Sequence, residues 1–156
     1  INASVRFITN RGGTHELVRH RLCAFSQEST RYVNYSGEME FIRPVWLKIQ
    51  LGICDHLTYE NSTGDNWYWL GAMLDAEKNY NDLLKRDWRP EQAREVLPNS
   101  LKTEIVVTAN LREWRHIFNL RCSKKAHPQI RALMQSCLKG FKEQIPVIFD
   151  NLYPEE

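Results

Sequence analysis

The chain has 156 residues, of which 42% are hydrophobic and 26% are charged. These proportions are ordinary for a globular protein, and a domain of about this length buries roughly 70% of the surface that its unfolded chain exposes. The formal net charge of +2 is far from the strongly basic character that is typical of proteins that bind nucleic acids or anionic membranes. The composition therefore indicates one globular domain, and we expect neither a nucleic acid nor a membrane as a partner.

Signals for a membrane, a secretory route or a metal are also missing from the sequence. No apolar run approaches the roughly 20 residues of a spanning helix, and the first residues lack the regions of a signal peptide. The five histidines show no zinc-binding spacing, and neither do Cys23, Cys54, Cys122 and Cys137. We therefore expect a cytoplasmic location, no disulfide framework and no metal site.

Short β segments and one long helix are predicted in the first half of the chain. Residues 4–9 and 30–35 are rich in β-branched and aromatic residues and predict strands. Residues 39–46 predict another, which Pro44 limits to an edge or a strand end. Turn and N-cap residues at 60–66 precede a helix from about 66 to 86. Its apolar face consists of Leu70, Met73, Leu74, Tyr80 and Leu84.

The second half of the chain gives stronger patterns. Pro90 and Pro98 delimit a short helix, and the valines, isoleucine and threonines within 102–110 predict a strand. Residues 111–123 predict a helix, and a last helix begins near Pro128 and keeps helical spacing to Ile145. Strands and helices do not alternate as in a parallel sheet. The sequence therefore predicts an α+β fold, with helices packed on an antiparallel or mixed sheet.

Common catalytic motifs are absent, and the cysteines give only weak signals. The chain has neither of the usual glycine-rich phosphate loops and no nucleophile elbow, and residues 10–14 offer only a Gly-Gly turn. Cys137 belongs to an apolar helical stripe and is interpreted as a core residue. Cys23 and Cys122 lie close to arginines, which could lower the pKa of a thiol.

Arginines give the strongest chemical signal. Arg19, Arg21 and Arg31 occur among serine, threonine and glutamine residues, and a guanidinium matches the geometry of a phosphate. This pattern predicts one wall of a site for a phosphorylated ligand, and the alternative is a solvated basic face. A second polar group lies on the helix predicted at 111–123, where the alternative is a polar outer face. Its members are Arg112, Arg115, His116, Asn119 and Arg121.

Four motifs give the chain a resemblance to a known family. Residues 19–29, RHRLCAFSQES, fit the pattern Arg-His-Arg, seven residues, Ser, which resembles the signature of the flavin-dependent thymidylate synthases. Three further matches follow in that family's order: STRY at 29–32, AREVLP at 93–98 and NLREWRHIFNLR at 110–121. The resemblance covers essentially the whole chain. It implies an FAD-dependent methyltransferase that converts dUMP to dTMP, with methylenetetrahydrofolate as carbon donor and NADPH as reductant. It also implies an α+β homotetramer whose active sites span subunits.

The same resemblance implies roles for individual residues. Arg121 would be the catalytic residue, facing the uracil ring and favouring its ionisation at N3, and Arg94 would bind the nucleotide phosphate. The implied FAD-binding residues are Arg19, His20, Arg21, Gln27, Asn110, Arg112 and His116. The implied dUMP-binding residues are Glu16, Leu17, Val18, Arg19, Gln27, Glu28, Ser29, Thr30, Arg31, Arg94 and Arg121. The chain departs from residues seen in relatives at Glu16, Gln27, His116 and Lys125.

Residues 1–156 are thus expected to form a single domain of this family that lacks the further N-terminal region usually contributing flavin contacts. Two alternatives are kept. One is a flavin- and nucleotide-binding domain without turnover. The other is a small RNA-binding domain that uses arginines and aromatic residues such as Tyr32 and Trp114, against which the low net charge argues.

Overall fold

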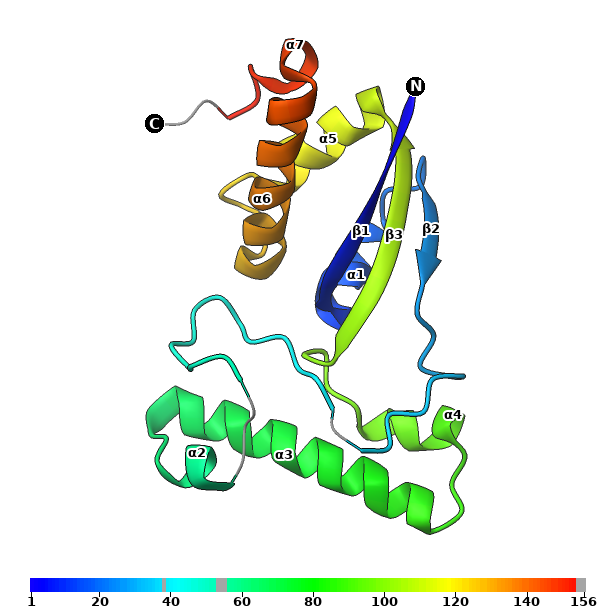
Figure 1. Cartoon of the computed structure of the whole chain (residues 1–156), viewed down its shortest axis with the longest axis vertical. Coiled ribbons are helices and arrows are strands. Elements are labelled where there is room, and N and C mark those ends of the chain that lie inside the picture. Colours follow the sequence, from blue (N-terminus) through cyan, green and yellow to red (C-terminus); the bar gives the residue numbers. More distant parts are fainter. Residues whose placement is uncertain (38, 53–55, 154–156) are drawn as a thin grey trace. The chain divides into compact units, whose positions relative to one another are not determined.

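The computed structural model describes residues 1–37, 39–52 and 56–153 (Figure 1). The chain divides into two compact units. The first unit comprises Ile1–Ile8, Gly13–Gln27 and Glu104–Glu156, and the second comprises Thr9–Gly12 and Glu28–Thr103. The expectation of a single family domain over the whole length stays a prediction.

A three-stranded sheet has β3 (Lys102–Asn110) as its central strand, between β1 (Asn2–Asn10) and β2 (Ala24–Gln27) (Figure 1). β2 pairs with β3 in the antiparallel sense, with Ala24 opposite Thr108. β1 is antiparallel to β3 as well, because Ser4 contacts Thr108 while Arg6 contacts Glu104 further back along β3. Alternate residues of β3 are buried, as its period-2 pattern predicts. The predicted α+β fold and the strands predicted at 4–9 and 102–110 are confirmed.

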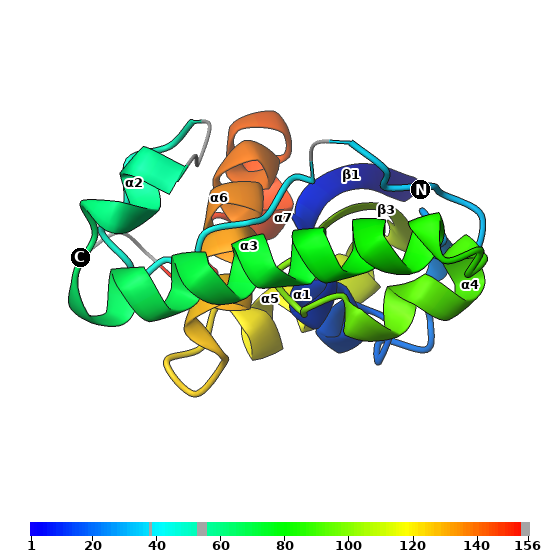
Figure 2. The same ribbon diagram turned by 90° about the horizontal axis from the view of Figure 1, so that it is seen from below.

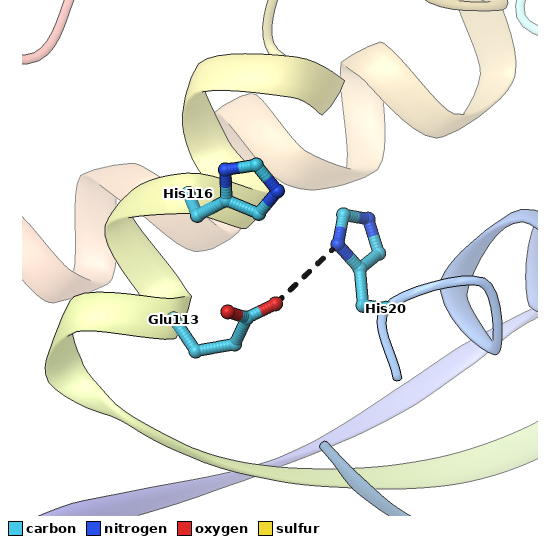
Figure 3. Close-up of side chains that lie close together, drawn as sticks. All are labelled: His20, Glu113 and His116. Carbon is cyan, nitrogen blue, oxygen red and sulfur yellow. Dashed lines mark ion pairs between the residues drawn. The ribbon is translucent and has the colours of Figure 1, made fainter. Parts of the chain in front are cut away.

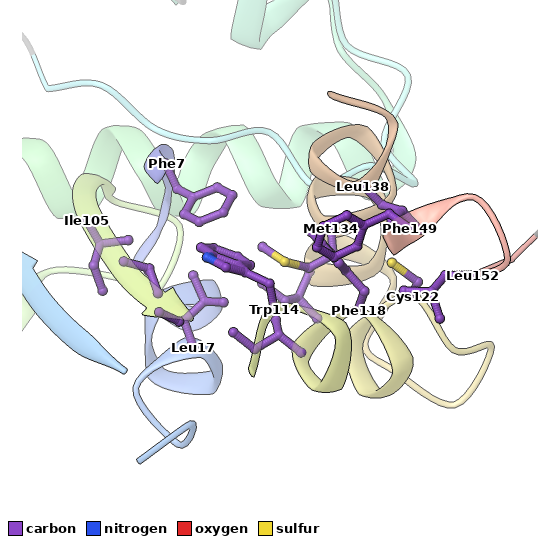
Figure 4. Packing of buried hydrophobic residues seen from close by; sticks show 14 residues of the cluster. Phe7, Leu17, Ile105, Trp114, Phe118, Cys122, Met134, Leu138, Phe149 and Leu152 are labelled. Carbon is purple, nitrogen blue, oxygen red and sulfur yellow. The ribbon is translucent and has the colours of Figure 1, made fainter. Parts of the chain in front are cut away.

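Helices α5 (Leu111–Arg121), α6 (Pro128–Gln144) and α7 (Pro146–Phe149) build the core of the first unit (Figure 4). Asn110 caps α5 by accepting a hydrogen bond from the Glu113 backbone N–H at 2.8 Å, and Pro128 stands in the first turn of α6. Trp114 is completely buried and stacks on Phe118, with ring centroids 5.6 Å apart. Its indole N–H donates to the Ala3 carbonyl at 3.1 Å. Truncating such a residue to alanine typically costs about 3–5 kcal/mol of stability, so α5 is firmly held beside β1.

The second unit is organised around α3 (Gly64–Lys85), with α4 (Pro90–Ala93) and the 3-10 helix η1 (Arg94–Val96) near its C-terminal end (Figure 2). These elements confirm the helices predicted at 66–86 and after Pro90. Tyr80 of α3 is fully buried, and its hydroxyl accepts the Tyr35 backbone N–H at 3.3 Å. The short helix α2 (His56–Glu60) packs against α3, where Gly71 leaves room for the ring of Tyr59.

Two predicted strands are wrong. Residues 30–35 form a turn and irregular chain, because the backbone N–H groups of Tyr32 and Val33 both donate to the Ser29 carbonyl, at 3.1 and 3.0 Å. Intrinsic β-propensity is easily overridden by such local bonding. Within 39–46 the strand is reduced to a single bridge between Phe41 and Leu101.

The Gly-Gly turn expected at 10–14 is instead the start of a helix, α1 (Arg11–Leu17). The backbone N–H of Arg11 donates to the Leu101 carbonyl and that of Gly12 to the Asn99 carbonyl, each at 3.2 Å. Neighbouring chain thus satisfies two of the donors that the first turn of any helix leaves free. These bonds offset the poor helix propensity of the two glycines.

Candidate functional site

Arg121, at the C-terminal end of α5, is the centre of a polar network in the first unit. Its Nε–H donates to Nε2 of His20 at 3.0 Å, and Nη2 donates to the backbone carbonyl of Glu16 at 2.8 Å. Nη1 donates to the Glu16 carboxylate. The Arg121 side chain is only 18% exposed. Glu16 and His20, which the resemblance assigns to substrate and cofactor, are therefore both bonded to Arg121, about a hundred positions later in the chain.

His20 lies in the turn that follows α1 and is 6% exposed. Its ring meets that of His116 edge-on, with centroids 5.9 Å apart, and its Nδ1 lies 3.7 Å from a carboxylate oxygen of Glu113 (Figure 3). Burial, then the nearby Arg121, then His116 lower the pKa of His20 to about 4. The imidazole is therefore neutral near pH 7. Because a guanidinium can only donate, Nε2 must be the acceptor nitrogen and Nδ1 must carry the proton.

His20, Glu113 and His116 also form a group with metal-ligand chemistry, which the scattered histidines of the sequence did not reveal. Their ligand atoms lie within 4.8 Å of one another. A zinc ion needs a free lone pair on each imidazole, with nitrogen at about 2.0–2.1 Å. On His20 one nitrogen accepts from Arg121 and the other carries the proton. The adjacent guanidinium also opposes a cation, so this donor set does not fit a divalent ion.

Three other arginines of the first unit are exposed, in contrast to Arg121. Within the described residues, no hydrogen-bonding or ion-pair partner is found for the guanidinium groups of Arg19, Arg21 and Arg112. Arg112 and Asn110 contribute to a shallow cavity of about 430 Å³. Cations without partners can bind phosphate oxygens at little cost, because no existing ion pair has to be broken. Each of these side chains is therefore available to an anionic ligand.

Other predicted residues of this unit contribute in more limited ways. The amide of Gln27 donates to the Thr14 hydroxyl at 2.9 Å, which orients Gln27 from α1. Leu17 is 1% exposed and belongs to the apolar core, so only its backbone is available to a ligand. Val18 is exposed.

A second polar group lies in the other unit and contains Ser29, Thr30, Arg31 and Arg94. Arg94, in η1, donates from Nη1 to the hydroxyl of the buried Thr30 at 3.3 Å, and its Nε lies 3.7 Å from the Glu95 carboxylate. Arg31 is exposed and its guanidinium lies over the ring of Tyr32, 5.2 Å from the centroid. Thr30 therefore contacts Arg94 from within the turn that replaces the strand predicted at 30–35.

Glu28 lies at the start of the same segment. Its carboxylate accepts a hydrogen bond from the Tyr35 hydroxyl at 3.4 Å. Burial and this carboxylate raise the pKa of Tyr35 to about 12, so the phenol stays protonated. The Tyr35 hydroxyl therefore holds the Glu28 side chain in place. Glu28 is the one acidic residue in the segment 28–31.

The thiols do not show the activation that neighbouring arginines suggested for Cys23 and Cys122. Burial raises the pKa of each of these two thiols to about 11 and that of Cys137 to about 12. All three are therefore protonated at neutral pH and are poor nucleophiles. Cys122 lies in the apolar core. Cys137 is partly buried and packs against that core, as the helical stripe containing Cys137 predicted. Cys54 lies outside the described residues.

The sequence interpretation did not assign a role to Glu113. Its signals were present: Asn110 three residues earlier is an N-cap residue, and His116 three residues later lies on the same helix face. Neither signal points to His20, which is 93 positions away and becomes a neighbour only when the chain folds.

Comparison with known proteins agrees with these motifs. Residues 1–147 match the family described as "Thymidylate synthase complementing protein". The chain belongs to this family. The resemblance found in the sequence is therefore confirmed over nearly the whole length. In the part of the chain that the structure describes, no helix is long and apolar enough to cross a membrane.

Curated members of the family are similar to this chain in sequence. The flavin-dependent thymidylate synthase of Corynebacterium efficiens is 37% identical over 151 residues, covering 94% of this chain and 59% of that protein. The enzyme of the same name from Geobacter sulfurreducens is 37% identical over 145 residues, covering 93% and 58%. The chain thus spans about three fifths of the length of these relatives.

A solved structure shares the fold of this family member. It is that of the flavin-dependent thymidylate synthase ThyX from Helicobacter pylori, complexed with FAD and dUMP. The TM-score is 0.74, the sequence identity is 22%, and the match covers 97% of this chain and 72% of that one. At this identity the likeness establishes the fold.

Proposed function

We propose that this chain carries the catalytic residues of a flavin-dependent thymidylate synthase. The reaction is conversion of dUMP to dTMP, with methylenetetrahydrofolate as carbon donor, NADPH as reductant and FAD as cofactor. The observation that carries the proposal is the network in which Arg121 is held by Glu16 and His20, because it joins the Arg-His-Arg motif to the second arginine-rich motif of the family. Relatives bearing this enzyme name give independent support.

FAD would be held by residues of the first unit. Arg19, Arg21 and Arg112 offer exposed guanidinium groups for its phosphates, and Asn110, His20, His116 and Gln27 are the polar side chains assigned to it. The bound flavin would supply hydride transfer, so that the reaction would need no cysteine nucleophile. The raised pKa values of Cys23, Cys122 and Cys137 agree with that division of labour.

The nucleotide would use two kinds of arginine. Arg94, which donates to the Thr30 hydroxyl, would bind the phosphate. Glu28, Ser29 and Arg31, the neighbours of Thr30 in sequence, would line the nucleotide as well. Arg121 would face the uracil. A guanidinium has five N–H groups, and three of those on Arg121 are used within the protein, so two remain for a carbonyl or a ring nitrogen. A fixed cation there stabilises negative charge that develops on the ring.

We also propose a homotetramer in the cytoplasm. Large apolar side chains are exposed on the second unit, among them Trp46, Leu51 and Tyr68. Exposed apolar surface of this kind is typical of protein–protein interfaces. Light scattering of the flavin-loaded protein tests the assembly, and a stable monomer with full FAD occupancy would refute active sites shared between subunits.

The experiment that tests the activity begins with the visible spectrum of the purified full-length protein, where flavin bands are expected. dTMP formation is then measured with dUMP, methylenetetrahydrofolate and NADPH, together with release of tritium from C5 of labelled dUMP, the position that receives the new carbon. Bound flavin with neither product would support a binding domain without turnover. A protein that takes up no flavin from excess FAD contradicts the proposal.

A further inference from the structure

We propose that Glu113 is a positioning residue, which sets the tautomer and orientation of His20 and, through His20, the direction in which Arg121 points. This inference rests on the proposed role of Arg121 toward uracil. Neither the motifs of the family resemblance nor the comparisons gave Glu113 a role.

Glu113 occupies the third position of α5, where a glutamate usually serves another purpose. In a capping box it reaches back to the backbone N–H of the N-cap residue. Here Asn110 does accept a bond from the Glu113 backbone N–H at 2.8 Å, but within the described residues the Glu113 carboxylate does not bond the backbone of Asn110. The carboxylate is turned toward His20 instead (Figure 3).

The Glu113 side chain is also buried, since it is only 8% exposed. A buried carboxylate is costly unless polar groups compensate for lost water. The polar groups near it include the N-terminal turn of α5, His116, the Cys23 thiol and the His20 ring, whose Nδ1 lies 3.7 Å from Oε1. A purely structural helix cap would not need this burial, because capping can be done at the surface.

Coupling to Arg121 follows from the two nitrogens of a neutral imidazole. A carboxylate facing Nδ1 favours the tautomer with the proton on Nδ1 and disfavours a lone pair there. Nε2 is then the acceptor, and it receives the Nε–H of Arg121 at 3.0 Å. Without Glu113 only the bond from Arg121 would still favour this tautomer, and a proton on Nε2 would meet the Nε–H of Arg121. Two donors would then oppose each other, and the guanidinium would lose one of its three anchors.

The lowered pKa of His20 agrees with this arrangement. Burial and the positive charge of Arg121 lower it to about 4, and His116 acts in the same direction. Near pH 7 the ring is therefore neutral and its tautomer matters. Glu113 is an acidic group that faces the ring.

The test uses Glu113→Met, which removes the carboxylate at similar size, and Glu113→Gln, whose amide oxygen can still face the Nδ1–H of His20. Glu143→Met is the matched control, because Glu143 is an exposed carboxylate on α6. Nitrogen-15 NMR of the full-length protein with labelled histidine reports the tautomer, with His20 assigned by comparison with His20→Asn. We expect the proton on Nδ1 in the wild type, in Glu113→Gln and in the control, and a shift toward Nε2 in Glu113→Met.

Turnover gives the second readout. In Glu113→Met we expect kcat to fall about tenfold while KM for dUMP changes less than about threefold, and we expect Glu113→Gln to recover most of the loss. A folded Glu113→Met protein with an unchanged His20 tautomer overturns the inference. So does a wild-type His20 with its proton on Nε2. If the wild type makes no dTMP, the proposed function fails while the NMR comparison still decides the role of Glu113. If Glu113→Met does not fold, Glu113→Asp, whose carboxylate is drawn back by one methylene, is measured in its place.

Discussion

Arg121 and Arg94 are both assigned to the nucleotide, yet their surroundings differ. Arg121 has three anchors and is 18% exposed. Arg94 has one hydrogen bond, to Thr30, a looser approach to Glu95, and a side chain that is 36% exposed. A guanidinium held on several sides is suited to a charge that appears only during reaction, since it needs no reorganisation. A guanidinium with open N–H groups is suited to a phosphate that carries its charge throughout.

The largest effect is expected for Arg121→Ala, which should lower kcat by about 100-fold or more, as removal of one preorganised donor does in other enzymes. Arg121→Lys should recover little, because an ammonium cannot reach Glu16 and His20 together. Steady-state kinetics with dUMP are the measurement. Arg115→Ala is the control, because Arg115 bonds Asn151 at 2.9 Å and ties α5 to the end of the chain. Arg115→Ala should lower Tm and leave kcat nearly unchanged. If Arg121→Ala has the same effects, the catalytic role proposed for Arg121 is wrong.

Arg94→Ala should mainly raise KM for dUMP, by about 10- to 100-fold, with kcat changed little. The reason is that binding energy used equally in ground and transition states does not lower the chemical barrier. Arg94→Lys should keep part of the affinity, because phosphate also accepts a compact point charge. Initial rates over a range of dUMP concentrations measure both constants. A fall in kcat as large as that of Arg121→Ala would show that the two arginines do not differ in role.

His20 makes the Arg121 network sensitive to acid. Its pKa is about 4 in the folded protein and 6.5 in the unfolded chain, so the unfolded chain binds the extra proton between these values. The free energy of unfolding should therefore fall as pH drops from about 6.5 to 4, by roughly 3 kcal/mol at most. His20→Asn should show a smaller fall. Urea unfolding at pH 7, 5.5 and 4.5 measures the difference between the two proteins, and parallel curves would mean that His20 is not the responsible group.

The smallest effects are expected at the cysteines. Serine at Cys23, Cys54, Cys122 or Cys137, one at a time, should leave turnover within about tenfold, which corresponds to roughly 1.4 kcal/mol of barrier. For the three described thiols the raised pKa values also predict slow alkylation by iodoacetamide at pH 7.5. If turnover falls by several orders of magnitude in one folded variant, that cysteine takes part in the reaction and the prediction is wrong.

Sequence patterns predicted the elements whose periodicity is long and undisturbed. β3 and α6 are of this kind, with clear period-2 and helical spacing. β2 was missed because four residues with alternating partial exposure carry too little signal. α1 was missed because two glycines argue against a helix and its stabilising partners, the carbonyls of Asn99 and Leu101, are distant in sequence.

The sequence resemblance named candidate site residues but did not indicate how they contact one another. The motifs contain His20 and Arg121, and the resemblance they carry also implies Glu16. In the structure Arg121 bonds both His20 and Glu16. Nothing local in the sequence indicates that Glu16 would hold Arg121 through both its carboxylate and its backbone carbonyl, 105 positions away. Glu113 escaped notice for the same reason. Long-range pairing of polar groups depends on the path of the chain, which local patterns do not encode.

The central place of β3 in the sheet also shapes how the chain is made. β1 and β2 are synthesised first, but both pair with a strand that begins only at Lys102. At about 5–20 residues per second, the first strand waits roughly 5–20 s for its partner. During that time the apolar face that includes Phe7 has neither β3 nor Trp114 to cover it. The second unit, most of which lies between β2 and β3 in sequence, emerges in this interval. The nascent chain therefore leaves the apolar face of β1 available to chaperones until β3 and α5 have been translated.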